Sequence, residues 1–298
     1  MKTFSIHNGG DWVLIEKLES EKKQVDVPAF TIQHKVDNKT PKDFHSHPGY
    51  EVVWVRSGEA QFIFEEKVFH LKKGHVLLFN SSELHKVRLP DNQAYDRVMI
   101  MFTDHLFCYE QPIFQEFKHL LNQQPTSHCF LEIEERGYED FYHIIRQLLQ
   151  EEMSPDKWQH QHALILYVSE LLLFFSRAIH TSIDRTFHIS DSNPVLTQER
   201  ILKEINRIWH TNWQLEDLAE KLHFNKYYLC HFFKKEFGMT IHHYILQRRM
   251  YEAKKLLMET NMPIAEIASR IGFSTASNFI RCFKKYHHVT PKQFRNQA

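Results

Sequence analysis

The sequence predicts an α+β chain of two domains, an antiparallel β domain with covering helices followed by an all-α domain. A length of 298 residues suits roughly two domains. Strand-like sequence fills residues 29–102, and helical periodicity begins near residue 138. Charge is divided similarly: residues 195–298 hold 17 Lys and Arg against 9 Asp and Glu, which leaves 20 against 28 for residues 1–194. A basic domain joined to an acidic one favours a polyanionic partner for the basic part.

The β domain is predicted from five runs rich in Val, Ile and Phe. The runs are AFTIQHKV, YEVVWVRSG, EAQFIFEEKVFHL, HVLLFN and YDRVMIMF. Turn signals such as GE, KKG and LPDN separate them. Short strands joined by tight turns pair antiparallel, so we expect an all-β unit with this topology.

Two amphipathic helices are predicted next, between about Tyr138 and His180. The first places Phe141, Ile144 and Leu148 on one face. The second is apolar over a wide arc that includes Leu164, Tyr167, Val168, Leu171, Leu172 and Phe175. Two explanations fit this arc. The helix packs only within its own core, or it also meets a second copy of the chain, which would make the protein a homodimer.

The sequence gives no signal for export or membrane insertion. The N-terminal stretch lacks the continuous apolar core of a signal peptide. Ser169 and Glu170 interrupt the most apolar run before it reaches the ~18 residues that a membrane span needs. The four cysteines form no CxxC pair, which suits a reducing cytoplasm. Residues 181–194 show no periodicity and are expected to link a domain of residues 1–180 to one of residues 195–298.

An internal repeat organises the C-terminal domain. LAEKLHFN at Leu218–Asn225 matches IASRIGFS at Ile267–Ser274 with an offset of 49. LCHFFKK at Leu229–Lys235 matches FIRCFKK at Phe279–Lys285 with an offset of 50. Each copy predicts a short helix, a tight turn, an N-cap at the Asn or Ser that ends the first match, and a second amphipathic helix. This is the pattern of a helix-turn-helix unit.

A helix expected over residues 241–259 separates the two copies. At 1.5 Å per residue it spans about 28 Å, close to the ~34 Å between successive major grooves on one face of B-DNA. One chain could therefore place two second helices in adjacent grooves. Lys234, Lys235, Lys284 and Lys285 would then lie near phosphates, although a lysine pair at a helix end also suits a solvated face.

From Leu215 to Arg295 the sequence resembles the DNA-binding domain of AraC/XylS-type transcriptional regulators, and AEIASRIGFSTASNFIRCFKKYHHVTPKQFR follows the family signature closely. The resemblance implies a sequence-specific DNA-binding regulator. Carried over by position, the base-contacting residues would be Tyr227, Tyr228, Cys230, His231, Ser277, Asn278 and Arg281. Arg281 is the best candidate for a bidentate contact to guanine. The chain departs from the family pattern at Gln214, where a Ser or Thr cap is usual, and at His288, where glycine is usual.

The stretch FHSHPGYEVVWVRSGE contains a candidate metal site. Side chains alternate faces along a strand, so His45, His47 and Glu51 would point the same way. HxH alone is a weak signal in a chain with 22 histidines, and a second pair, His160 and His162, falls in a predicted helix.

The same stretch resembles cupin motif one, which would end at Gly58. GHVLLFNSSELH resembles motif two, from Gly74 to His85, with Asn80 and Ser82 where cupins commonly have Pro and Gly. The resemblance implies a cupin-like barrel, which is the usual sensor partner of this DNA-binding domain.

Two roles remain open for His45, His47, Glu51 and His85. Three imidazoles and a carboxylate suit Zn, Mn, Fe or Ni. Regulators that the chain resembles often retain these residues while they bind an organic effector and no metal, so the four residues can instead have a structural or effector-binding role. A sugar or related small metabolite would need aromatic and hydrogen-bonding groups within the barrel. The candidates are Trp12, His34, Tyr50, Trp54 and Arg97.

The sequence therefore predicts a cytoplasmic one-component transcription regulator and not an enzyme. We expect a homodimer that binds double-stranded DNA and a sugar or related metabolite, with RNA polymerase as a further partner that this class allows. The alternative is a metal-dependent cupin enzyme fused to a DNA-binding domain, although no general base stands out beside the four candidate ligands. The effector, the operator, and activation or repression stay open at this stage.

Overall fold

A computed structural model describes residues 30–41, 43–90, 93–108, 111–123, 128–133, 135–183 and 193–297. Its contacts divide the chain into two compact units, which among these residues are 30–248 and 249–297. The division falls inside a long helix, α8 (Ile241–Glu259). The first helix-turn-helix unit therefore shares a compact unit with the β domain. Most of the expected linker lies outside the described residues, so the predicted domain boundaries stay a prediction.

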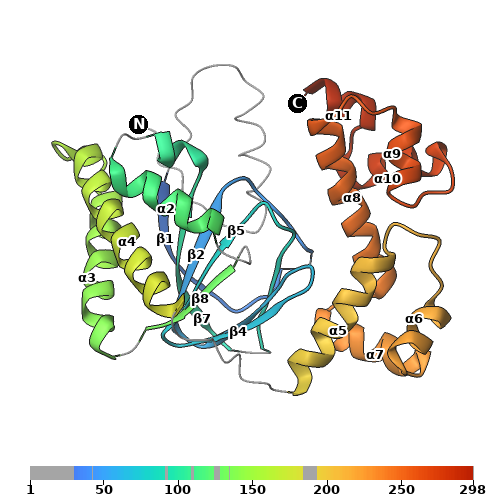
Figure 1. The fold of residues 1–298 in the computed structure, drawn as a ribbon, viewed down its shortest axis with the longest axis horizontal. Helices are drawn as coiled ribbons and strands as arrows, with labels where there is room; N and C mark the ends of the chain where they lie inside the picture. Colours follow the sequence, from blue (N-terminus) through green and yellow to red (C-terminus); the bar gives the residue numbers. More distant parts are fainter. Residues whose placement is uncertain are drawn as a thin grey trace. The chain divides into compact units, whose positions relative to one another are not determined.

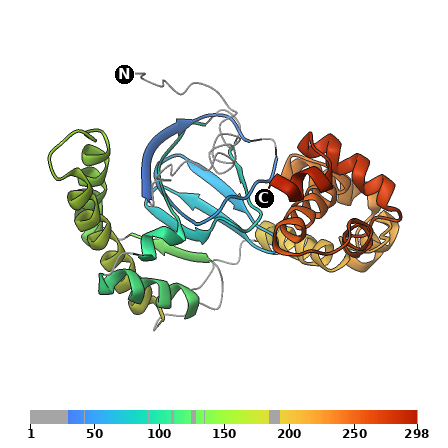
Figure 2. The same cartoon turned by 90° about the horizontal axis from the view of Figure 1, so that it is seen from above.

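Eight strands in the described part of the chain form two antiparallel sheets (Figure 1). The larger has the order β1-β7-β2-β5-β8 and the smaller the order β4-β3-β6. The strands are β1 (Phe30–Asp37), β2 (Tyr50–Ser57), β3 (Glu59–Ile63), β4 (Val68–Lys72), β5 (His75–Asn80), β6 (Lys86–Arg88), β7 (Tyr95–Phe102) and β8 (His128–Glu132). Viewed from above, the strands curve around a common interior (Figure 2). The predicted antiparallel β domain is confirmed.

Side chains of β2 alternate between two cores. Val53 and Val55 point inward, to a cluster between the sheets that also holds Phe62 of β3. Val52 and Trp54 point outward, to a cluster beneath the covering helices. Burying one such side chain stabilises the fold by about 1.5–3 kcal/mol, so the alternation fixes the register of the sheet.

Gly58 allows the tight connection between β2 and β3. Its φ is +79°, in the region that glycine adopts without strain, and a Cβ there would lie 2.2 Å from the carbonyl oxygen of Ala94. The predicted motif thus ends in glycine at this position because a larger residue would collide with the backbone of Ala94.

Helices cover the outer face of the larger sheet. They are η1 (Asp104–Cys108), α2 (Pro112–Gln123), α3 (Glu135–Glu152) and α4 (His160–Ile183). Helix α4 packs against both α2 and α3. The prediction contained α3 and α4 but not α2, β6 or β8. Strand β6 has three residues, too few to show an alternating pattern.

One segment in the described part of the chain, His160–His180, is long and apolar enough to cross a membrane by length and composition. Leu171, Leu172 and Phe175 of this segment pack into the core beneath the helices. Core packing accounts for part of its apolar character, because 28% of the most apolar stretch is buried.

Both predicted helix-turn-helix units are present. The first consists of α6 and α7, preceded by α5 and followed by α8, and the second consists of α9 and α10, followed by α11. Their bounds are α5 (Asn193–Ile208), α6 (Leu215–Leu222), α7 (Lys226–Phe237), α9 (Ile264–Arg270), α10 (Ala276–His287) and α11 (Pro291–Gln297). The expected helix over residues 241–259 is α8.

The N-cap prediction is confirmed for one copy and wrong for the other. The side chain of Asn225 caps α7 by accepting a hydrogen bond from the backbone amide of Tyr227 at 2.8 Å. Helix α10 is capped by Thr275 and not by Ser274. The Thr275 hydroxyl accepts from the backbone amide of Asn278 at 3.2 Å. The two caps, Asn225 and Thr275, are 50 residues apart. The extra residue that changes the repeat offset from 49 to 50 therefore precedes the cap of α10.

Both second helices end on a left-handed residue. Gly238 ends α7 with φ 71°, and His288 ends α10 with φ 62°. A non-glycine residue in this region costs about 1–2 kcal/mol, so His288 carries strain that the glycine usual at this position would avoid.

Candidate nucleic-acid interface and sensor site

The exposed side of α7 carries the first set of predicted DNA contacts. Leu229, Phe233 and Phe237 are buried, which turns the opposite side outward. Exposed on α7 are Tyr227, Tyr228, Cys230, His231, Lys234 and Lys235. Tyr227 is 74% exposed and Tyr228 51%, high values for aromatic side chains. The arrangement leaves aromatic groups at the start of the helix and cations at its end.

Helix α10 repeats this arrangement with polar residues. Phe279 and Phe283 are buried. The exposed residues include Ser277, Asn278, Arg281, Lys284 and Lys285. The Arg281 guanidinium donates to the side-chain oxygen of Asn278 at 3.3 Å, which uses one of its five N–H donors. The two side chains can therefore orient each other toward a base edge.

His45, His47 and His85 form the histidine cluster of the β domain. One ligand-capable atom of each lies within 4.8 Å of the other two. A β-bridge joins His45 and His85, and each backbone amide donates to the carbonyl oxygen of the other residue at 2.9 Å. The structure thus brings together the three predicted imidazole ligands.

Glu51, the fourth predicted ligand, contacts His47, with 3.2 Å between the carboxylate oxygen and Nε2. Burial alone would raise the pKa of Glu51, but the hydrogen bond with His47 and the nearby imidazoles bring that pKa below its usual range. Burial lowers the pKa of His45 to about 3 and lowers the pKa of His85. The site therefore combines a carboxylate with neutral imidazoles at His45 and His85, the form of histidine that binds metals.

The donor set fits a divalent metal ion. The Nδ1 of His85 donates to the carbonyl oxygen of Glu83 at 2.8 Å, which leaves Nε2 with its lone pair. That Nε2 is buried and has no hydrogen-bond partner among the described residues. A backbone carbonyl that fixes the tautomer in this way is typical of metal-binding histidines.

The predicted effector residues do not lie together. Trp12 falls outside the described residues. Tyr50 stacks on Phe102 with ring centroids 5.2 Å apart, and Trp54 packs edge-on against Phe141 of α3 at 5.3 Å. Both face the covering helices because they alternate with the inward-pointing Glu51, so they do not line the interior as expected.

His34 and Arg97 lie on β1 and β7. His34 Nε2 is 2.7 Å from a carboxylate oxygen of Asp96, in an exposed position. Arg97 lies over the Tyr95 ring at 4.7 Å, and one of its terminal nitrogens is 2.6 Å from Asp37. Its other terminal nitrogen and the Tyr95 hydroxyl are buried without hydrogen-bond partners among the described residues. Of the predicted set, Arg97 is therefore the best placed to bind a polar effector.

Contacts between the first helix-turn-helix unit and the β domain are absent from the sequence prediction. The Lys86 ammonium donates to the carbonyl oxygen of Phe237, the last residue of α7, at 3.1 Å. The Phe44 ring meets the Tyr244 ring of α8 edge-on at 5.0 Å, and the Phe44 amide donates to the side chain of Gln247 at 3.4 Å. We call these the docking contacts. They join segments that are far apart in the sequence, so no local sequence signal could have indicated them.

Charged pairs surround the docking contacts. Arg88 lies 3.6 Å from Glu236 of α7, and Arg248 lies 2.7 Å from Glu65. The Val68 backbone amide donates to the Glu199 carboxylate of α5 at 3.2 Å. Charge complementarity therefore accompanies the apolar contact.

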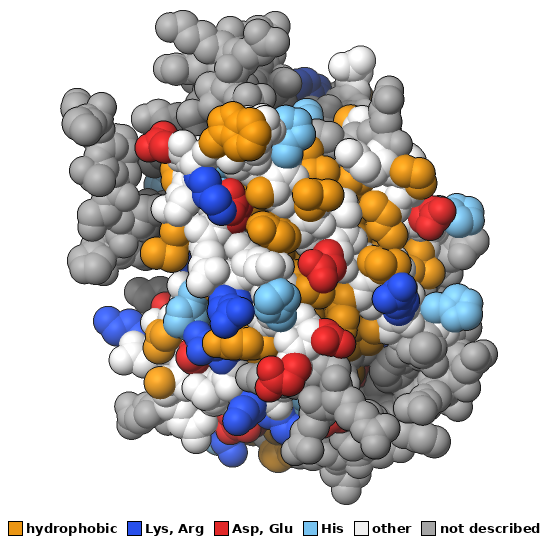
Figure 3. Space-filling model, turned by 90° about the vertical axis from the view of Figure 1, so that its left-hand side faces the viewer, with side chains coloured by type: hydrophobic (Ala, Val, Ile, Leu, Met, Phe, Trp, Pro, Cys, Tyr) orange, Lys and Arg blue, Asp and Glu red, His pale blue; other side chains and the backbone are white. Residues whose placement is uncertain are grey.

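The outer face of α3 and α4 gathers hydrophobic side chains between scattered charges (Figure 3). From Leu166 to His180 of α4 the exposed positions follow a 4-3-4-3 spacing. They are Leu166, Glu170, Leu173, Arg177 and His180. Leu166 is 68% exposed and Leu173 38%. This spacing places the five side chains on one face of the helix, opposite its buried residues.

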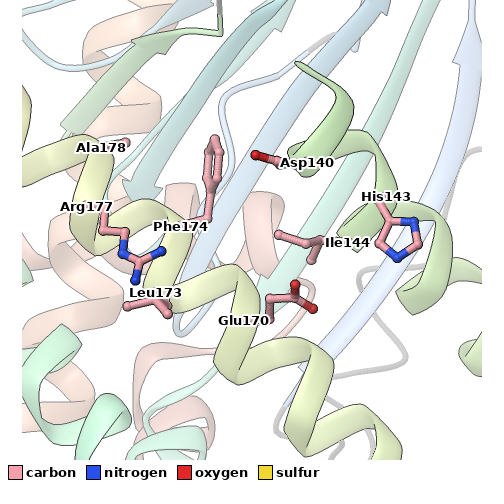
Figure 4. A pocket seen from close by; sticks show the side chains of 8 residues that line it. All are labelled: Asp140, His143, Ile144, Glu170, Leu173, Phe174, Arg177 and Ala178. Atoms are coloured by element: carbon pink, nitrogen blue, oxygen red, sulfur yellow. The ribbon is translucent and has the colours of Figure 1, made fainter. Parts of the chain in front are cut away.

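A groove of about 490 Å³ lies between α3 and α4 (Figure 4). Its lining comprises Asp140, His143, Ile144, Glu170, Leu173, Phe174, Arg177 and Ala178. The lining combines apolar side chains with side chains of both charges.

Two family models match the chain. A model of the AraC-like ligand-binding domain matches residues 29–172, and a model of a helix-turn-helix domain matches residues 218–297. An uncharacterized HTH-type transcriptional regulator of Staphylococcus aureus (strain COL) is 24% identical over 265 residues, which are 88% of this chain and 33% of that protein. The HTH-type regulator YtdP of Bacillus subtilis (strain 168) is 35% identical over 99 residues, 33% of this chain and 13% of that protein. The chain spans about a third of the length of the first of these relatives and less of the second.

Solved structures with similarity include the C-terminal domain of the two-component response regulator yesN from Fusobacterium nucleatum. It is 40% identical, with 34% of this chain and 98% of that chain covered, at a TM-score of 0.33. ToxT from Vibrio cholerae is 15% identical, with 91% of this chain and 99% of that chain covered, at a TM-score of 0.35.

Proposed function

The chain belongs to the AraC-type family of transcriptional regulators, and from this membership we propose that it is an effector-responsive regulator that recognises operator DNA through α7 and α10. The single observation that carries the proposal is the paired exposure of these helices. Each buries two phenylalanines on one side and presents exposed residues on the other, aromatic and basic on α7 and polar and basic on α10. Two such helices in one chain suit two adjacent major-groove segments.

Replacement of Arg281 by alanine tests base recognition. We expect Arg281→Ala to lower the affinity for specific operator DNA by about 1–3 kcal/mol, because a bidentate contact to guanine is lost. Affinity for unrelated duplex DNA should change little. A gel-shift titration of both DNAs measures the difference. Arg207→Ala, which removes an exposed arginine from α5, is the charge-matched control, and an equal loss in both variants would contradict base recognition.

The effector is proposed to be a sugar or related small metabolite that binds in the β domain. Arg97 and Tyr95 support this role, because each has a buried polar atom without a hydrogen-bond partner among the described residues. Binding of the effector would favour one arrangement of the DNA-binding helices over another. This requires that the effector bind the two arrangements with different affinities.

The histidine cluster is proposed to hold a divalent metal ion. His45, His47 and His85 would be the ligands, with Glu51 as a fourth ligand or as the hydrogen-bond partner that orients His47. A bound Zn²⁺, Mn²⁺, Fe²⁺ or Ni²⁺ would supply a fixed positive charge and a structural link between the two bridged segments. The buried Nε2 of His85 is the observation that favours it.

The functional form is proposed to be a homodimer that pairs through α4. Glu170 and Arg177 lie symmetrically about Leu173 and Phe174 in the sequence. Two antiparallel copies of α4 centred there would place each Glu170 opposite the Arg177 of the other copy. The exposed leucines would be buried in the seam.

The cellular location of the chain and a contact with RNA polymerase are also proposed. Family membership favours the cytoplasm as the site of action, and a contact with RNA polymerase would follow if the regulator activates transcription. Both depend on the DNA-binding role, because that role brings the chain to a promoter.

A further inference from the structure

Two members of the histidine cluster are direct chain neighbours of two residues that make docking contacts. Phe44 precedes His45, and Lys86 follows His85. Neighbouring side chains of an extended segment point to opposite sides. The imidazoles therefore face the cluster, while the Phe44 ring and the Lys86 ammonium face α7 and α8. Since the β-bridge ties the two segments together, a shift in one moves the other.

A metal site and the docked arrangement need different geometries. In the docked arrangement the ligand-capable atoms are spread over distances of up to 4.8 Å. Tetrahedral zinc with Zn–N bonds of about 2.0–2.1 Å holds its nitrogen ligands only about 3.3 Å apart. Closing the cluster around a metal therefore draws the imidazoles together by roughly 1 Å.

The docking contacts are sensitive to a shift of this size. The Lys86 side chain is almost completely buried, and its bond to the Phe237 carbonyl is 3.1 Å long. A further ~1 Å takes this pair outside hydrogen-bonding range. The amide of Phe44 is already 3.4 Å from Gln247, near the limit of a hydrogen bond.

We propose that a divalent metal ion at the histidine cluster releases the first helix-turn-helix unit from the β domain. The proposal rests on the metal site proposed above and adds its regulatory consequence. Lys86 holds the last residue of α7, so release frees the helix that presents Tyr227 and Tyr228. By thermodynamic reciprocity, docking weakens metal binding by the same factor by which the metal weakens docking.

Hydrogen exchange of the full-length chain with and without zinc chloride tests the proposal. The Val68 amide reports docking directly, because its acceptor is the Glu199 carboxylate of α5. The Val53 amide, in the centre of β2, serves as the internal reference. We expect zinc to accelerate exchange at Val68 about fivefold or more while Val53 is unchanged.

Three variants complete the test. His85→Gln should abolish both tight zinc binding and the exchange response at Val68. His105→Ala, which removes an exposed histidine elsewhere, should leave both unchanged. Phe44→Ala should give fast exchange at Val68 without zinc and bind zinc about fivefold more tightly.

The outcomes separate the two proposals. Zinc binding that depends on His85 but leaves Val68 exchange unchanged or slower overturns the coupling and keeps the metal site. Failure of zinc to bind through the cluster overturns the metal site together with the coupling. Neither result bears on DNA recognition by α10.

Discussion

Individual side chains in this chain take up positions that their residue type alone does not favour. His288 adopts a left-handed conformation at the end of α10, where the equivalent residue of α7 is Gly238. Lys86 is buried, and its ammonium group binds the carbonyl end of a helix, the end at which the helix dipole favours a cation. The backbone conformation of His288 and the tertiary contact of Lys86 are both features that sequence periodicity does not report.

Replacement of His288 by glycine should stabilise the second helix-turn-helix unit. We expect His288→Gly to raise the free energy of unfolding by about 1 kcal/mol, because glycine adopts the observed φ without a Cβ clash. Thermal or urea unfolding measures the change. Gly238→Ala at the equivalent end of α7 is the reverse test: it places a Cβ on a left-handed residue and should be destabilising. If His288→Gly proves destabilising, side-chain contacts of His288 outweigh the strain.

Metal content tests the histidine cluster at the level of single ligands. Protein purified without a histidine tag should contain about one divalent metal ion per chain by elemental analysis. His45→Gln or His85→Gln should reduce this to background because one imidazole ligand is lost, whereas His105→Ala should not. Substoichiometric metal in the unmodified protein under all growth conditions would leave the cluster as part of an organic effector pocket.

Among the elements, α4 and α8 each serve two neighbours. Helix α4 buries Leu171, Leu172 and Phe175 in the core beneath the helices while it exposes regularly spaced side chains on its other side. Core packing thus accounts for the whole of the apolar arc predicted for this helix. The proposed dimer would cover Leu166 and Leu173, which lie outside that arc. Helix α8 contributes Tyr244 to the docking contacts and continues into the second compact unit.

Charge reversal on α4 tests the dimer. Glu170→Arg should weaken self-association about tenfold or more, because each antiparallel pair then places two like charges together. The double variant Glu170→Arg and Arg177→Glu should restore it. Sedimentation velocity over a concentration series provides the readout. A monomeric unmodified chain, or a double variant no better than the single one, would rule out this seam.

For the molecule as a whole, a feature can be predicted when the residues that form it are close together in the sequence. The apolar run of YEVVWVRSG and the repeat around LAEKLHFN are local, so the strands and both helix-turn-helix units are predictable. The approach of His85 to the other histidines follows from the family resemblance. The docking contacts join Lys86 to Phe237 and Phe44 to Gln247. They depend on tertiary packing between distant segments, which no local pattern encodes.

The same reasoning explains the errors. Aromatic groups suit a sugar, so the sequence predicts Tyr50 and Trp54 inside the barrel. Both are an odd number of residues from the inward-pointing Glu51 along β2, so they face the helix-covered side. An alignment of the repeat without its inserted residue makes Ser274 the cap of α10, whereas Thr275 caps it.

Selection of DNA sequences by the purified chain tests the central claim most directly. From a pool of random duplexes, the account predicts enrichment of one motif with two half-sites about 10 base pairs apart, since the two second helices would enter successive major grooves. Arg281→Ala should relax the sequence preference in one half-site and leave the other intact. Enrichment of no motif above the unselected pool, under conditions in which the chain is folded and binds duplex DNA, would contradict the account.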